Sequence, residues 1–109
     1  MITWEDFEKL DIRLGTIVSA EIFPAARKPA YKLTIDFGAL GIKQSSAQIT
    51  HYYKPEDLLQ KQVVAVINFP PKNIAGFMSQ CLVLGVYDVQ GHVVLLSPER
   101  HAQNGAKAG

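Results

Sequence analysis

A long run of alternating residues near the amino terminus constrains the fold most. Between Asp11 and Phe23 every second position is apolar or β-branched, the members of this set being Ile12, Leu14, Thr16, Val18, Ala20 and Ile22. This period of two predicts one long β-strand. Gly15 lies in its interior, and a glycine within a strand favours a bend or a close backbone approach. We therefore expect a curved first strand that serves both halves of a small barrel.

Shorter apolar and β-branched runs predict the remaining strands. One of them is almost wholly apolar, as expected for a strand buried on both faces, and Pro70 and Pro71 end it. The last two runs flank Val89, Gln90 and Gly91, which predict a hairpin turn. The strands predicted in this way cover residues 30–37, 42–50, 62–69, 80–88 and 92–97.

Two short helices are predicted. Thr3 and Asp6 can form a capping box at the start of the first, whose apolar stripe consists of Trp4, Phe7 and Leu10. Such a stripe stays exposed unless it docks on the barrel or on a partner. The second helix is expected within residues 51–61, where Pro55 precedes two acidic residues.

Prolines predict loops at residues 24–29 and 71–78, and the polar, glycine-containing tail from Glu99 is expected to be loosely held.

About five main strands with a short helix between the third and fourth match an all-β, five-stranded OB-fold barrel. The 109 residues predict a single domain, 1–109. An SH3-like barrel or an open sandwich would show similar spacing, so strand count leaves these alternatives open.

The charge balance and the single cysteine limit the function classes. The net charge is +1, so binding to a polyanion requires local clustering of basic residues. Cys81 cannot form an intramolecular disulfide, which fits a reducing compartment, and we expect a cytoplasmic location. No secretory signal is apparent, and the apolar runs are far shorter than the roughly 20 residues of a membrane-spanning helix, so membrane insertion is not expected.

No residue pattern predicts catalysis. His51, His92 and His101 show no metal-ligand spacing, and no nucleophile motif or phosphate-binding glycine loop occurs. Cys81 lies in an apolar run, where a thiol is usually inert packing. We expect no enzyme activity, no metal and no cofactor.

Basic and polar residues near two predicted loops and one strand are candidates for ligand binding. Arg27, Lys28 and Lys32 surround the first loop, and Lys72 lies in the second. Strand 42–50 has Lys43 on one side and Ser46 and Gln48 on the other; such side chains bind phosphates and base edges, and tyrosines and phenylalanines are available for stacking. The second loop also holds Ile74, Phe77 and Met78, which either pack over the barrel mouth or form a peptide-binding patch.

Long segments resemble a known family. Residues 6–17 (DFEKLDIRLGTI) resemble the opening of the tRNA-binding domain. Residues 26–33 (ARKPAYKL), 45–50 (SSAQIT), 68–72 (NFPPK) and 76–79 (GFMS) resemble its CsaA branch.

The resemblance implies an OB-fold that binds tRNA without catalysis, and a homodimer to which the amino-terminal helix, with Trp4, Phe7 and Leu10, and the carboxy-terminal segment contribute contacts. The CsaA branch is also described as a chaperone linked to protein secretion, so the alternative is a protein that binds unfolded or preprotein peptides through Phe77 and Met78. The resemblance implies a polar and basic groove formed by Arg27, Lys32, Ser46, Gln48, Lys72 and Ser79.

Overall fold

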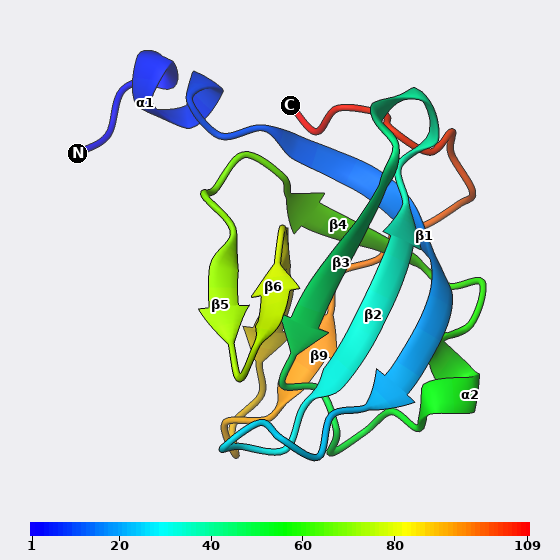
Figure 1. The fold of residues 1–109 in the computed structure, drawn as a ribbon. Helices are drawn as coiled ribbons and strands as arrows, with labels where there is room; N and C mark the ends of the chain where they lie inside the picture. The colour runs from blue at the N-terminus through cyan, green and yellow to red at the C-terminus, as the bar shows by residue number, and fades with distance from the viewer.

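The first long strand pairs with two different neighbours along its length. In the computed structural model, which describes residues 1–109, β1 (Ile12–Ile22) pairs with β4 (Gln62–Val66) through residues 12–16 and with β2 (Tyr31–Asp36) through residues 16–22. A register shift between Ile17 and Ser19 adds to its curvature. The ribbon of β1 accordingly wraps around one side of the molecule (Figure 1). The predicted curved strand is confirmed.

Gly15 is needed where β1 crosses the core. A Cβ atom added there would lie 2.6 Å from Ile35 Cγ2 and 2.8 Å from the Phe37 ring. These distances are shorter than van der Waals contact, so any side chain would push the two buried residues out of place. The interior glycine therefore marks a close approach of backbone to core.

The main sheet curls into a nearly closed barrel. Its strand order is β3-β2-β1-β4-β7, with β3 at Ile42–Ala47 and β7 at Leu82–Val83. At the seam the Gln80 amide donates to the Gln44 carbonyl at 2.8 Å, and the Gln44 amide donates to Gln80 Oε1 at 2.9 Å. The predicted all-β, five-stranded OB-fold barrel is confirmed.

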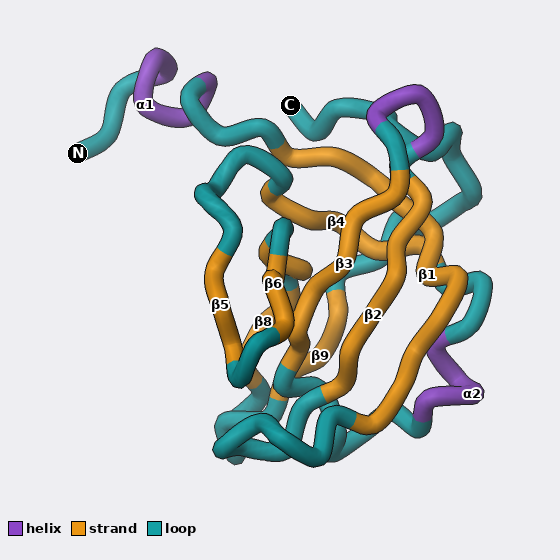
Figure 2. Tube along the Cα trace, viewed as in Figure 1, coloured by secondary structure: helices purple, strands orange, loops and turns teal.

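The core fills the barrel interior and is closed at one end by a helix. Helix α2 (Pro55–Leu58) lies between β3 and β4, as predicted, and Leu58 is fully buried. The other fully buried large side chains include Ile17, Leu33, Ile35, Phe37 and Val63. Burial of each such side chain contributes about 1.5–3 kcal/mol to folding. Helices otherwise stay at the periphery, including the 3-10 turn η1 (Gly38–Leu40), as Figure 2 shows.

The predicted loop at residues 71–78 is instead a β-hairpin. Strands β5 (Lys72–Ile74) and β6 (Phe77–Ser79) pair around a turn in which Ala75 and Gly76 both have positive φ. Asn73 Oδ1 accepts a hydrogen bond from the Gly76 amide at 2.8 Å. Three-residue strands are too short for a visible alternation, and alanine is an unusual residue at a position that favours glycine or asparagine. The expectation of a loop was therefore wrong.

The predicted strand at residues 80–88 is divided. Strand β7 ends at Val83, and β8 (Gly85–Tyr87) leaves the barrel to pair with β9 (Val93–Leu95) in a separate ribbon. The hairpin turn between them is confirmed. The close pairing of β8 with β9 requires a glycine at position 85. A Cβ atom there would lie only 2.6 Å from Val93 Cγ1 and 2.7 Å from the Val94 carbonyl oxygen, which is shorter than van der Waals contact. Strands β3 and β4 also end earlier than predicted, at Ala47 and Val66.

The carboxy-terminal tail is held against β1, contrary to the expectation of loose attachment. The amide of Leu14 donates to the Ala106 carbonyl at 3.0 Å, the Gly105 amide to the Leu14 carbonyl at 2.7 Å, and the Ala108 amide to the Ile12 carbonyl at 2.9 Å. Because β2 pairs only with the second half of β1, the first half has a free edge on that side. The tail supplies the missing partners, which a polar composition alone does not reveal.

The amino-terminal helix α1 (Trp4–Glu8) projects away from the barrel (Figure 1). The predicted capping box is present: Thr3 Oγ1 accepts from the Asp6 amide, and Asp6 Oδ2 accepts from the Thr3 amide. Asn68 fixes the connection to β1, donating to the Lys9 carbonyl at 2.8 Å and accepting from the Asp11 amide at 2.9 Å. No helix in the structure combines the length and apolar character needed to cross a membrane.

We predict that Asn104→Ala destabilises the fold by about 1–3 kcal/mol, because half-buried Thr16 loses its acceptor and buried Gln62 keeps only the Ala102 carbonyl as an acceptor. Asn104 Oδ1 accepts from Thr16 Oγ1 at 2.8 Å and from Gln62 Nε2 at 3.2 Å. Urea unfolding followed by circular dichroism measures the change. The neighbouring exposed residue supplies the control: Gln103→Ala should stay within about 0.5 kcal/mol of the parent. Equal stability of the two variants would mean that these bonds do not hold the tail.

Candidate functional site

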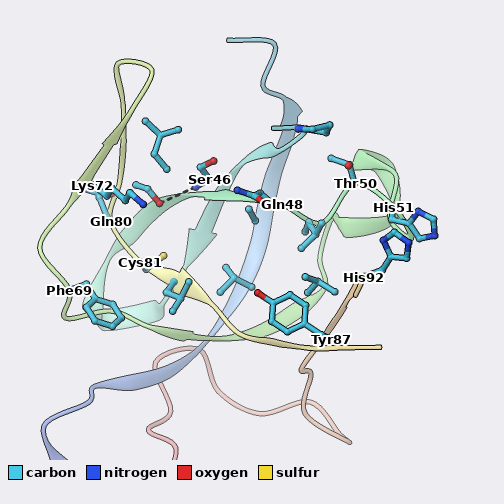
Figure 3. A pocket seen from close by; sticks show the side chains of 18 of the residues that line it. Ser46, Gln48, Thr50, His51, Phe69, Lys72, Gln80, Cys81, Tyr87 and His92 are labelled. Atoms are coloured by element: carbon cyan, nitrogen blue, oxygen red, sulfur yellow. Dashed lines mark hydrogen bonds between the residues drawn. The ribbon is translucent and has the colours of Figure 1, made fainter. Parts of the chain in front are cut away.

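A groove of about 1020 Å³ lies across the polar side of β3. It runs between the segment after β3, the β5–β6 hairpin, β7 and the β8–β9 ribbon, and Figure 3 shows Lys72 and His51 toward opposite ends. Its twenty lining residues include one lysine and two histidines but no aspartate or glutamate. The groove therefore offers hydrogen bonds and positive charge without a carboxylate that would repel an anion.

Four of the predicted binding residues form a continuous row across four strands. Lys32 on β2 is the cross-strand neighbour of Ser46 on β3. The Ser46 amide donates to Ser79 Oγ at 3.1 Å, and Ser79 on β6 pairs with Lys72 on β5. Neighbours directly opposite each other in a sheet share one face. The row therefore presents two hydroxyls between Lys72, which lines the groove, and Lys32, which lies beside the groove and opposite Glu21 on β1.

The Lys32 side chain is held in place by two aromatic rings. Its Nζ lies 4.8 Å from the centroid of Phe23 and 5.4 Å from that of Phe77, and the two rings meet edge to face at 5.4 Å. Cation–π attraction keeps the ammonium group above the rings. Phe77 therefore supports the basic row and is half-buried.

The other predicted residues lie around this row at different depths. Gln48 is exposed in the groove, and Ile74 lines it, whereas Met78 is exposed on the hairpin. Arg27 and Lys28 are exposed on the loop between β1 and β2; Arg27 lines a second hollow that shares Pro29 and Thr50 with the groove.

Lys43 lies away from the row. Its cross-strand partner is Ile35, which is fully buried, so Lys43 occupies the inward side of β3, opposite Ser46. The inward side also carries Ser45, Ala47 and Ile49, all buried, which agrees with the alternation expected for this strand. The structure does not bring Lys43 together with the other basic residues of the groove.

A stack of two histidine rings at the groove was not predicted from the sequence. The imidazoles of His51 and His92 stack with centroids 3.5 Å apart and planes inclined by 4°. The Tyr52 ring meets His51 edge to face at 4.6 Å, and Tyr87 is 78% exposed in the groove. His51 follows β3 and His92 precedes β9, so no sequence spacing connects them.

Asp88 holds this cluster together. One carboxylate oxygen accepts from the amides of Gln90 at 3.0 Å and His92 at 2.9 Å, and the other accepts from the Tyr52 hydroxyl. The Tyr52 hydrogen bond, followed by that from the His92 amide, lowers the pKa of Asp88. The same bond to Asp88 raises the pKa of Tyr52. The carboxylate thus ties the hairpin turn to the segment after β3.

Cys81 lies beneath the groove and is 6% exposed. Burial raises the pKa of its thiol to about 11. At neutral pH the group is protonated, and a protonated thiol is neither a nucleophile nor a metal ligand. This agrees with its interpretation as core packing.

Comparison with known proteins identifies similarity to one domain family and to two chaperone structures. Residues 12–107 match the family model described as "Putative tRNA binding domain". The chain is 39% identical over 105 residues to methionine--tRNA ligase of Methanococcoides burtonii, a match that covers 96% of this chain and 15% of that enzyme. It thus spans about 15% of the length of the curated relatives it matches.

Two solved structures are similar over their whole length. The chaperone CsaA of Bacillus anthracis has a TM-score of 0.95 and 57% identity, with 100% of this chain and 99% of that chain covered. The CsaA chaperone protein of Picrophilus torridus has a TM-score of 0.94 and 51% identity, with both chains fully covered. These structures bear out the resemblance seen in the sequence motifs.

We predict that Asp88→Asn lowers the melting temperature at neutral pH and that the difference from the parent disappears in acid. Because the folded-state pKa of Asp88 is lowered, its ionised form stabilises the fold above the ordinary value of 3.8. This stabilisation is lost as the pH falls through the lowered pKa. Thermal unfolding between pH 7 and pH 2 measures the effect. Glu21→Gln, at an exposed carboxylate outside the cluster, serves as control; a difference for Asp88→Asn that persists unchanged in acid would contradict the prediction.

Proposed function

The chain belongs to the tRNA-binding domain family, and we propose that it is a non-catalytic, cytoplasmic module that binds tRNA in the groove and works as a homodimer. The observation that carries the proposal is the row formed by Lys32, Ser46, Ser79 and Lys72. Lysines interact with phosphates as point charges, and serine hydroxyls hydrogen-bond to phosphate oxygens. The row thus suits a segment of RNA backbone.

Local charge makes up for the low charge of the whole molecule. With a net charge of +1, the protein does not attract RNA through its overall field. The groove lining has no carboxylate, the one acidic neighbour of the row is Glu21 opposite Lys32, and Arg27 and Lys28 extend positive charge along the adjoining loop. Attraction is therefore concentrated where the row lies.

Unpartnered apolar side chains support self-association. On α1, Trp4 is 85% exposed and Leu10 just beyond it is 37% exposed, while Phe7 is half-buried. The outward face of the β8–β9 ribbon adds a second patch, Val86, Val94 and Leu96. A two-fold interface would cover such patches and give the dimer two grooves. One tRNA contacting both would gain affinity through avidity.

A second candidate function is binding of unfolded or preprotein segments as a chaperone in protein secretion. The similar structures from Bacillus anthracis and Picrophilus torridus are described as chaperones. Phe69 in the groove is 49% exposed and Met78 on the hairpin is 42% exposed, which provides apolar surface for a peptide. Phe77, in contrast, is engaged with Phe23 and Lys32.

The two functions are distinguished by a salt series. The protein is titrated with bulk tRNA and, in parallel, with an unfolded polypeptide between 50 and about 300 mM salt. Phosphate contacts make the logarithm of the affinity fall linearly with the logarithm of salt concentration, whereas apolar contacts tolerate salt. Steep tRNA binding without polypeptide binding supports the RNA module; the reverse pattern supports the chaperone.

We predict that Lys72→Ala and Lys32→Ala each weaken tRNA binding and reduce the salt slope by about one. Each lysine removed eliminates about one phosphate contact. Lys107→Ala is the matched control, because the Lys107 side chain is exposed on the tail and lies outside the groove. Its backbone forms an isolated β-bridge with that of Arg13 on β1. If all three variants keep the parental slope, the row does not contact phosphate.

We predict that Trp4→Glu weakens the dimer by about 2 kcal/mol, or roughly thirtyfold, since a buried interface tryptophan is often a dominant contact. Light scattering over a dilution series measures the shift from dimer to monomer. Leu59→Glu changes an equally apolar residue, 48% exposed beside α2, and should leave the mass unchanged. If the Trp4→Glu protein stays dimeric at every concentration, α1 is not part of the dimer interface.

A further inference from the structure

The rings at the end of the groove farther from Lys72 have no part in the proposed phosphate row. His51 comes from the segment after β3, while Tyr87 and His92 come from the β8–β9 hairpin. Figure 3 shows the two imidazoles side by side at the rim and Tyr87 directed into the groove. All three residues line the same groove as Ser46, Gln48 and Lys72.

The cluster is organised without a ligand. Parallel imidazoles 3.5 Å apart, inclined by only 4°, form a flat double layer. Asp88 fixes the hairpin through the amides of Gln90 and His92 and through the Tyr52 hydroxyl, and Tyr52 abuts His51. Side chains held in this way lose little conformational entropy when a ligand binds. The exposed His51 ring and the half-buried His92 ring are therefore fixed beside the groove and prepared for stacking, and the exposed Tyr87 ring lies in the same groove.

The surroundings indicate which flat ligand fits. A nucleotide brings a π face, a hydrogen-bonding base edge and a negative charge. The groove offers rings at one end, the amide of exposed Gln48 and the hydroxyl of Ser46 along its length, and the Lys72 ammonium group at the other end, with no carboxylate among its lining residues. Every nucleotide carries a phosphate that can pair with Lys72, whereas a peptide offers a negative charge only where its sequence has a carboxylate, so the charge pattern favours RNA.

We propose that His51, His92 and Tyr87 form a stacking site for an unpaired RNA nucleobase, whose neighbouring phosphates run along the groove toward Lys72. This inference rests on the proposed function and specifies its ligand class. The site would bind single-stranded RNA, such as a tRNA loop or end, and would not bind duplex RNA. Bases stacked on aromatic rings contribute affinity that depends little on sequence, because every base has a π face.

The test compares single-stranded and duplex RNA. Fluorescence anisotropy gives dissociation constants for an RNA of about eight adenosines, a length within the range bound by one OB-fold, for a duplex of equal length, and for bulk tRNA. Three variants are measured: His51→Ala with His92→Ala, His51→Phe with His92→Phe, and His101→Ala as a control at an exposed histidine of the tail. A 2-aminopurine base in the single strand reports stacking directly through quenching.

The alanine pair should weaken single-strand binding roughly 5- to 150-fold, the range measured for loss of one base stack. Its duplex affinity should stay at the parental value, and 2-aminopurine quenching should disappear. The phenylalanine pair keeps the rings and should keep most of the single-strand affinity and the quenching. This variant distinguishes loss of stacking from loss of folding, and His101→Ala should behave as the parent.

Several results would overturn the site. Parental single-strand affinity in the alanine pair, with tRNA binding still lost in Lys72→Ala, rejects the stacking site and leaves the proposed function standing. Equal losses for single strand and duplex in both histidine pairs reject it as well. If the parent protein binds no RNA at all, the proposed function fails together with it; if the rings govern polypeptide binding only, the site belongs to a peptide.

Discussion

The first half of strand β1 pairs with β4 and the second half pairs with β2. The change of partner occurs at Thr16, next to Gly15. The absence of a side chain at Gly15 lets the backbone pass within contact distance of Ile35 and Phe37. Without this close approach β1 could not curve enough to share both partners, and the sheet would stay open. The free edge that the change of partner leaves on the first half of β1 is also what holds the tail.

The groove is a consequence of how the barrel closes. At the seam between β3 and the segment before β7, side chains and backbone share the hydrogen bonds: Gln80 bonds to Gln44, and Ser79 to Ser46. The polar outer side of β3 is thereby brought beside the β5–β6 hairpin, which carries Lys72. On the inner side of the same strand, Ser45 Oγ donates to the Cys81 carbonyl at 2.8 Å and no buried side-chain polar atom lacks a partner. One strand thus completes the core and presents the site.

Much of the site was predictable because strand alternation and loop position place residues coarsely. Lys32, Ser46 and Lys72 were named from their positions in the sequence, Ser79 was added by the family resemblance, and all four lie in one row. Alternation also shows that Lys43 is on the side opposite Ser46, but it does not show that this side is the interior of the barrel at that point. The role of Phe77 under Lys32 could not be predicted, because the strands of the β5–β6 hairpin are too short to show an alternating pattern in the sequence.

By itself, the sequence determined the features that depend on neighbouring residues: the long curved strand, the capping box of α1, the short α2 and the polar side of β3. Local periodicity and capping are encoded within a few positions and can be read there. The tertiary structure alone decided the attachment of the tail, the division of residues 80–88 between barrel and ribbon, and the stack of His51 on His92. The tail on β1 and the histidine stack join segments far apart in the chain, through backbone hydrogen bonds or ring contacts that leave no periodic signal. The break at residue 84 depends on where β7 leaves its distant partner β4, which the local alternation does not show.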